Sequence, residues 1–157
     1  MKKFVLVSLF ALVGLGMVSA ASSGTLDLSA TASSVLELTL PGDFTGTIDD
    51  NSAGTVNTWN IGNVVVKSNH TGWTISISSA NAGLLKNGSV DSIDYKMTLG
   101  SLVTNNELSS TWTSSAQGKT PKAGTSYALS ISFTPSTTTY FAQGTYTDTL
   151  TVTLTGN

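Results

Sequence analysis

Cysteine and arginine are absent from this chain of 157 residues, and histidine occurs once. The lack of cysteine excludes disulfide bonds, a thiol nucleophile and a lipid anchor attached to a cysteine. His70 lies in a turn-like Asn-His-Thr-Gly sequence and is accompanied by no Gly-x-Ser-x-Gly motif, so we interpret it as a solvated loop residue. The sequence therefore predicts no catalytic residue, no metal site, no cofactor and no enzymatic activity.

Basic residues are few as well. Residues 1–20 hold two of the seven lysines, and the rest of the chain sets five lysines against nine acids, a net charge of −4. Nucleic acid is a poor partner for such a chain, because phosphate neutralisation needs clustered Lys or Arg. Asp49 and Asp50 begin an acidic run, Asp-Asp-Asn-Ser, which lacks the spacing of a known calcium loop and predicts a plain turn.

The first 20 residues have the features of an export signal. Lys2 and Lys3 precede an apolar run at 4–13, and Val18-Ser19-Ala20 supplies the small residues of a cleavage site. The apolar run is shorter than the roughly 20 residues of a membrane span. We expect a signal peptide at 1–20 and a protein that passes through the periplasm to the cell surface or exterior, without membrane insertion once the signal is removed.

Apolar and polar residues alternate along much of the remaining chain, which is typical of strands. Turn-forming sequences such as Asn69-His70-Thr71-Gly72 and Asn87-Gly88-Ser89 separate the alternating stretches. The sequence predicts an all-β, antiparallel sandwich of immunoglobulin type, with a jelly roll as the alternative. Stretch 61–68 is expected to be buried on both faces or bulged at Gly62, and the other predicted strands are 73–78, 93–99, 127–134 and 145–155.

The stretch TYTDTLTVTLT at 145–155 has threonine at every odd position. Its even positions include Tyr146, Leu150, Val152 and Leu154, so one face of this strand is expected to pack on the core and the other to face water. Its unpaired edge would be an aggregation hazard unless a partner covers it.

A second long alternation runs from Gly24 to Leu40, with small residues at 32–34. We interpret those small residues as a joint between an N-terminal extension at 21–34 and a sandwich domain at 35–157. The apolar positions of the extension are Leu26, Leu28, Ala30 and Ala32. Pairing of this segment with the last strand of another copy would give a contact that repeats without closing.

Three stretches together resemble the secreted pilin-like sandwiches, a group that includes spore coat protein U and the fimbrial subunits of chaperone–usher systems. They are GWTISISSANAGLLKNG, SIDYKMTLG and YALSISFTP followed by AQGTYTDTLTVTLT, and Gly144 matches the glycine of the pilin C-terminal signature. The resemblance implies an incomplete immunoglobulin-like fold, completed first by a periplasmic chaperone at an outer-membrane usher and then by the next subunit. It implies a donor strand carrying Leu26, Leu28, Ala30 and Ala32, and an acceptor groove formed around Gly144, Tyr146, Leu150, Val152 and Leu154.

The resulting functional prediction is a structural subunit of an extracellular fibre or coat, assembled as a homopolymer through its N-terminal strand and used in adhesion. The alternative is a self-complete monomeric surface or periplasmic module that binds a glycan or a protein. Flat aromatic rings suit sugar rings, and Trp59 and Trp112 lie in polar surroundings, so these two residues are the candidate glycan contacts. Trp73 lies on a predicted core face instead.

Overall fold

The computed structural model describes residues 25–156 and divides the chain into two units, with the boundary between Ala32 and Ser33. The predicted signal peptide and residues 21–24 of the extension lie outside the described residues. The described part contains ten strands and no helix, hence no helix able to cross a membrane. The strands are β1 (Leu36–Thr39), β2 (Asn57–Ser68), β3 (Thr74–Ser79), β4 (Leu84–Asn87), β5 (Asp91–Asp94), β6 (Lys96–Leu99), β7 (Val103–Glu107), β8 (Trp112–Thr113), β9 (Thr125–Phe133) and β10 (Leu150–Thr155).

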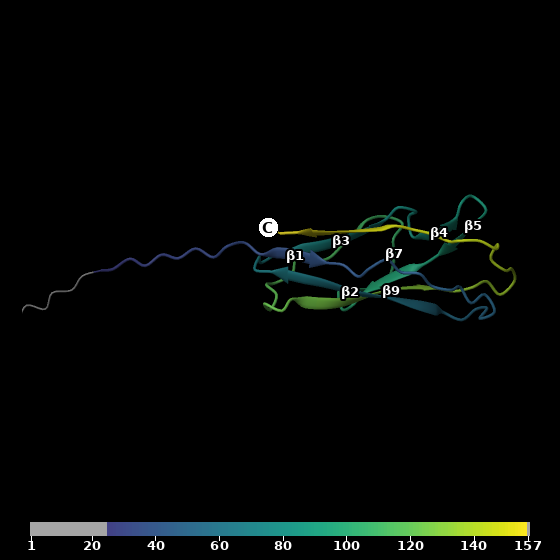
Figure 1. Cartoon of the computed structure of the whole chain (residues 1–157), viewed down its shortest axis with the longest axis horizontal. Helices are drawn as coiled ribbons and strands as arrows, with labels where there is room; N and C mark the ends of the chain where they lie inside the picture. Colours follow the sequence, from purple (N-terminus) through teal and green to yellow (C-terminus); the bar gives the residue numbers. More distant parts are fainter. Residues whose placement is uncertain (1–24, 157) are drawn as a thin grey trace, which may run out of the picture. The chain divides into compact units, whose positions relative to one another are not determined.

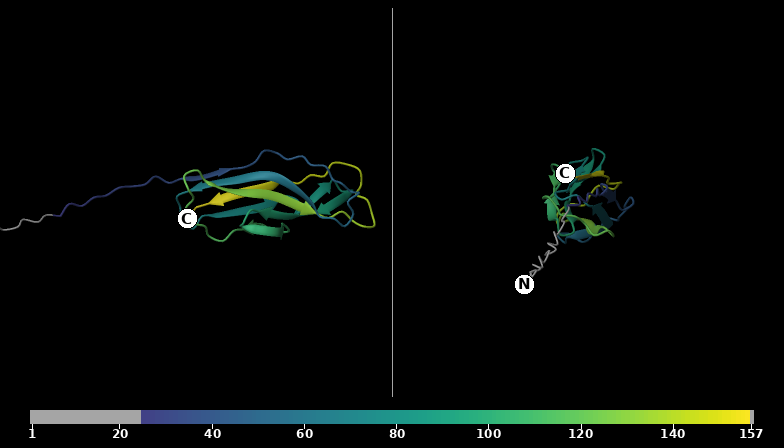
Figure 2. Two further views of the ribbon diagram at one scale, coloured as in Figure 1. Left: turned by 90° about the horizontal axis from the view of Figure 1, so that it is seen from below. Right: turned by 90° about the vertical axis from the view of Figure 1, so that its left-hand side faces the viewer.

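The strands of the domain form an antiparallel sandwich, which confirms the predicted fold class. One sheet has the order β1-β2-β9-β6-β7, the other has the order β10-β3-β8, and β4 and β5 form a separate hairpin. Figures 1 and 2 show the second sheet, with the yellow β10, lying over β2 and β9 of the first. The longest pairing joins β2 to β9 and shifts register between Asn60 and Gly62, as expected for a bulge at that glycine.

The core lies between the two sheets and is built by period-two alternation. Trp73, Ile75 and Ile77 are fully buried on one side, while the intervening residues of β3 are only partly buried. Alternate residues of β9 are buried opposite them, from Tyr127 to Phe133. Strand β2 follows the same rule in its second half, where Val64, Val66 and Ser68 are buried. The predicted core faces of these strands are therefore confirmed.

Two of the predicted strands are wrong in extent. The stretch 93–99 is divided at Tyr95, because β5 pairs with β4 whereas β6 pairs with β9 and β7 of the large sheet. The stretch 145–155 is a strand only from Leu150 onward, and before that point Thr147 makes a single bridge to Lys86. In both places the alternation continues while the partner changes, so the side-chain pattern alone does not mark the break.

The N-terminal alternation gives one short strand. Residues 36–39 form β1, which pairs with the end of β2 through Leu36 opposite Ser68. Residues 25–35 form no strand, and Leu26 and Leu28 are 82% and 88% exposed. An isolated extended segment cannot bury its own apolar face, and both leucines are accordingly exposed.

Candidate functional site

Two sheet edges of the domain are open on the same side of the sandwich. Strand β1 pairs only with β2, and β10 pairs only with β3, so each leaves one row of backbone N–H and C=O groups without a strand partner. The start of β1 meets the end of β10, because Gly156 lies against Leu36 so closely that a Cβ on Gly156 would come 3.1 Å from Leu36 Cδ2. The chain runs away from this junction in β1 and toward it in β10, so the two strands have opposite chain directions.

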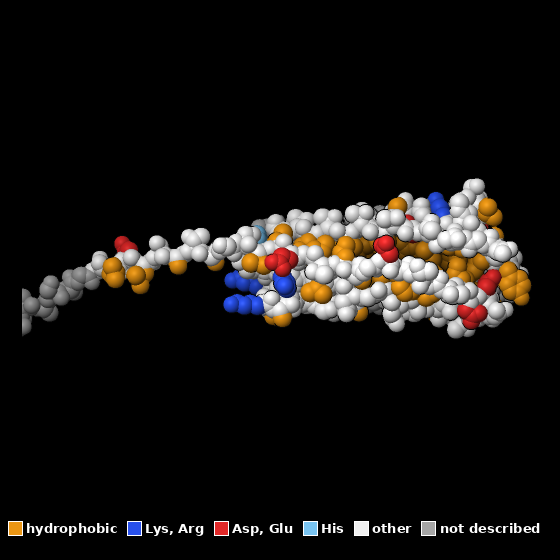
Figure 3. All heavy atoms as spheres, viewed as in Figure 1, with side chains coloured by type: hydrophobic (Ala, Val, Ile, Leu, Met, Phe, Trp, Pro, Cys, Tyr) orange, Lys and Arg blue, Asp and Glu red, His pale blue; other side chains and the backbone are white. Residues whose placement is uncertain are grey.

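A groove of about 790 Å³ lies between residues 40–48, which continue from β1, and β10 with the residues that lead into it. Its floor is largely apolar and comes from the large sheet, from the β4–β5 hairpin and from the residue that joins them: Trp59, Ile61, Leu129, Ile131, Leu85 and Tyr95. Figure 3 shows hydrophobic side chains along this side of the domain, between paler margins of polar side chains and backbone. On this floor Trp59 and Ile61 of the large sheet are only partly buried, whereas Leu129 and Ile131 are buried.

The first margin of the groove is residues 40–48, which continue from β1 without forming a strand. Leu40 and Phe44 are 46% and 40% exposed, and the Phe44 ring lies 5.6 Å from the ring of Trp59. Gly46 crosses the face of Trp59, where a Cβ would come 2.7 Å from the indole Cε2, so the close approach requires glycine. Within the described chain, residues 42–47 make no hydrogen bond. Van der Waals contacts therefore hold this margin: Phe44 and Gly46 pack on Trp59, Pro41 lies against Gly62, and Ile48 packs against the core.

The second margin is β10 with the residues that lead into it, and Asp148 fixes its position. The carboxylate accepts hydrogen bonds from Ser79 Oγ at 2.6 Å, the Tyr95 hydroxyl at 2.5 Å and the backbone N–H of Asn81 at 3.0 Å. Burial raises the pKa of the Tyr95 hydroxyl well above its ordinary value, and the bond to Asp148 raises it further. Tyr95 therefore stays protonated and donates to Asp148 across the floor of the groove.

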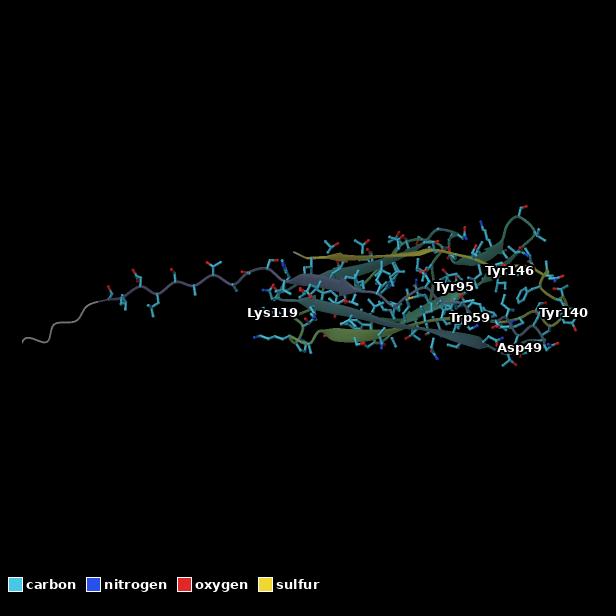
Figure 4. The ribbon with its side chains drawn as sticks, in the orientation of Figure 1. Asp49, Trp59, Tyr95, Lys119, Tyr140 and Tyr146 are labelled. Atoms are coloured by element: carbon cyan, nitrogen blue, oxygen red, sulfur yellow. The ribbon has the colours of Figure 1, made fainter. Side chains whose placement is uncertain are left out.

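Carboxylates also hold the end of the groove farthest from the β1–β10 junction. Asp91 accepts from the backbone N–H of Ala142 and from the Tyr146 hydroxyl, each at 2.9 Å. These bonds, together with the N–H of Ser92, lower the pKa of Asp91 below its ordinary value. Asp50 accepts from the N–H of Phe141 at 2.7 Å. Figure 4 shows Tyr146 on this side of the groove, with Trp59 and Tyr95 along its length.

The structure places most of the predicted acceptor residues on the groove. Gly144, Tyr146, Leu150 and Val152 line it, whereas Leu154 is half-buried near the end of β10 and packs against the core. Gly144 passes Asn87 so closely that a Cβ would collide with the Asn87 side chain. The predicted donor side chains, Leu26, Leu28, Ala30 and Ala32, are all exposed.

Trp59 and Trp112 are both half-buried and pack against the core, Trp59 with its ring 4.9 Å from Phe133. Trp59 belongs to the groove floor, and Trp112 lies in β8, so the two rings belong to different sheets. The glycan role of these residues stays a prediction.

Other sequence interpretations concern Asp49, metal sites and His70. Asp49 accepts from the N–H groups of Asn51 and Ser52, as the predicted turn requires. Within residues 25–156 no group of three or more acidic, His or Cys side chains gathers as at a metal site. His70 lies in a loop, as predicted, and is partly exposed, with its Nε2 2.7 Å from Ser34 Oγ.

The margin at 40–48 and the anchoring role of Asp148 were not predicted from the sequence. The signal for the margin was Gly46, two residues after Phe44, because glycine lets a backbone pass close over a ring. Asp148 was visible as the one acid among the even positions of 145–155, where a charged side chain facing a core needs partners.

No model of a known protein family matches the chain, and no curated protein is significantly similar to it in sequence. The geometry of the groove therefore carries the functional argument. An apolar floor between two open edges can bind an extended peptide, whose backbone pairs with the edges and whose alternate side chains enter the floor.

Proposed function

We propose that this protein is an exported structural subunit of a fibre or surface coat, and that its groove receives the N-terminal extension of a second copy. On this proposal the sandwich is of immunoglobulin type and lacks one strand, between β1 and β10. The observation that carries it is the coexistence, in one chain, of an open apolar groove between two free edges and an exposed segment of alternating apolar residues.

The extension suits the groove in its periodicity and side-chain size. Leu26, Leu28, Ala30 and Ala32 recur every second residue, so in an extended chain they project from one face about 6.6 Å apart. The side chains of β10 that face the core recur with the same period, at Leu150, Val152 and Leu154. The odd positions of the extension carry Thr25, Asp27, Ser29 and Thr31, which suit the solvent face of a completed sheet.

Burial supplies a driving force for the exchange. Transfer of an exposed leucine into a core is worth about 1.5–3 kcal/mol, and two exposed leucines in the extension gain this benefit. The added strand also gives partners to backbone groups on both edges and removes an aggregation-prone surface. Because the groove is apolar before assembly, a periplasmic chaperone that covers the same edges, acting with an outer-membrane usher, belongs to this proposal.

The experiment that tests the proposal is removal of residues 21–32 from the mature chain. We expect fibres in negative-stain images and heat-resistant oligomers in unboiled gel lanes for the parent chain, and monomers for the truncated one. A full-length control in which Leu26 and Leu28 are both replaced by serine keeps the length of the extension and is expected to behave like the truncation. Oligomers that survive both changes would contradict the proposal and favour a self-complete domain.

A further inference from the structure

The three residues before β1 are tied to the end of β2 by the side chain of Asn69. Asn69 Oδ1 accepts from the backbone N–H of Val35 at 2.9 Å, and Asn69 Nδ2 donates to the carbonyl of Ser33 at 2.7 Å. The backbone N–H of Asn69 donates to the carbonyl of Val35 at 3.1 Å. One asparagine therefore makes three hydrogen bonds to residues 33–35, which we call the Asn69 clamp.

The clamp continues the β1–β2 ladder beyond the last residue of β2. Leu36 pairs with Ser68, so Asn69 is the next partner and stands opposite Val35. Its side-chain amide supplies the acceptor and the donor that a further strand residue would supply. Ser34, between the two clamped residues, is held by its hydroxyl 2.7 Å from His70 Nε2. Residues 33–35 are thus kept in an extended, strand-like conformation.

The extended conformation of residues 33–35 affects whether the extension fills the groove of its own domain or that of another copy. To enter the groove of its own domain, the extension has to reverse direction near the junction where β1 starts and β10 ends. If residues 33–35 were free, they could form a three-residue hairpin loop and deliver all of 25–32 to the groove. With 33–35 clamped, the reversal falls at Thr31 and Ala32 or earlier, so Ala32 and the residues beside it are lost from pairing.

Strand direction does not separate the two modes. A segment returning from the junction into its own groove would run parallel to β10 and antiparallel to β1, whereas the extension of a second copy that approaches from the Tyr146 end runs antiparallel to β10 and parallel to β1. Each mode makes one parallel and one antiparallel pairing, so the clamp carries the distinction. We propose that Asn69 is a positioning residue that directs the extension to another copy and disfavours self-insertion. This inference rests on the proposed function and adds a means of controlling it.

The experiment uses engineered disulfides, which the absence of native cysteine makes unambiguous. The mature chain receives Leu28→Cys together with a second cysteine at Leu150, Val152 or Leu154, tested one at a time because a disulfide needs Cα atoms within about 7 Å. After oxidation, non-reducing gels separate intramolecular bonds, which leave monomers, from intermolecular bonds, which give a ladder. Each pair is made with Asn69, with Asn69→Ala and with Asn69→Asp, which can still accept from Val35 but cannot donate to Ser33.

The matched control is Asn63→Ala. Asn63 lies in β2 and is exposed like Asn69, and among the described residues its side chain makes no hydrogen bond. We expect a ladder for the parent chain and the control, and an increase of about tenfold in the intramolecular-to-intermolecular ratio for Asn69→Ala, the factor that loss of two exposed hydrogen bonds corresponds to. The ratio for Asn69→Asp should lie between that of the parent chain and that of Asn69→Ala. Circular dichroism melts of each variant check that the domain remains folded.

The outcomes separate the inference from the proposed function. If both Asn69 variants form a ladder and their intramolecular-to-intermolecular ratio equals that of the parent chain, the role of Asn69 is overturned and the fibre proposal stands. Absence of any disulfide between position 28 and β10, within or between chains, overturns both. Predominantly intramolecular bonds in the parent chain also overturn both, because the extension would then complete its own domain.

Discussion

Replacement of Leu28 by alanine gives the most direct measure of the proposed contact between subunits. Leu28 is 88% exposed in its own chain, so the change removes almost no packing from the isolated molecule. In the assembled form the same side chain enters the groove, and the difference between leucine and alanine corresponds to about 2.4 kcal/mol at 0.8 kcal/mol per buried carbon. That free energy equals a factor of about 50 in an equilibrium constant.

The assay follows the loss of assembled oligomers at a fixed elevated temperature, sampled over time on unboiled gels. Since changes at an interface act mainly on dissociation, Leu28→Ala should dissociate about 50-fold faster than the parent chain, while the unfolding midpoint of the monomeric fraction stays the same. Ser29→Ala is the matched control, because residue 29 projects from the opposite face of an extended chain and should dissociate at the parental rate. Equal rates for Leu28→Ala and Ser29→Ala would refute the period-two docking of the extension.

Three further predictions concern the domain. The pKa of Asp91 is lower in the folded state than the ordinary carboxyl pKa of about 3.9. The hydrogen bonds of its carboxylate therefore stabilise the fold fully above about pH 3.9, and this stabilisation is lost as the pH falls through the folded-state pKa. The melting temperature of Asp91→Asn should accordingly fall less between about pH 5 and pH 2 than that of the parent. Asp148→Ala leaves the hydroxyl of the buried Tyr95 without its acceptor and should lower the free energy of unfolding in urea by about 1–3 kcal/mol, whereas Asp148→Asn should lower it less. Lys119 and Asp49 lie at opposite ends of the domain (Figure 4), so Lys119→Glu should slow head-to-tail assembly in light-scattering traces at low salt, and Asp49→Lys in the same chain should restore part of the rate.

The parts of the fold that the sequence predicts are those where one local rule acts. In β3 and β9, alternation places Ile75, Ile77, Leu129 and Ile131 in the core, because every second side chain of a strand shares a face. The same rule failed at Tyr95, where the chain passes from the β4–β5 hairpin to the large sheet. There the side chains keep facing one core while the hydrogen-bond partners change, and partners are set by residues distant in sequence.

The candidate site was only partly predictable for the same reason. Leu150 and Val152 were recognisable as one face of a strand, and the structure places both on the groove. The margin at 40–48 has no period to detect, because packing of Phe44 and Gly46 on Trp59 determines its course. Asn69 begins a turn-like Asn-His-Thr-Gly sequence, and its hydrogen bonds to Ser33 and Val35 span more than thirty residues of sequence. No local pattern encodes such a contact.

The geometry of the two ends determines what kind of assembly the proposed contact builds. The extension leaves the domain through Ser33, held by Asn69 at the junction of β1 and β10, whereas a donor that runs antiparallel to β10 approaches from the end near Tyr146. Donation and acceptance therefore use different surfaces of the molecule, which makes the interface heterologous. Each added copy fills one groove and brings another open one, so the contact repeats along a line. A reciprocal dimer would require both extensions to reverse direction, and the Asn69 clamp opposes that reversal.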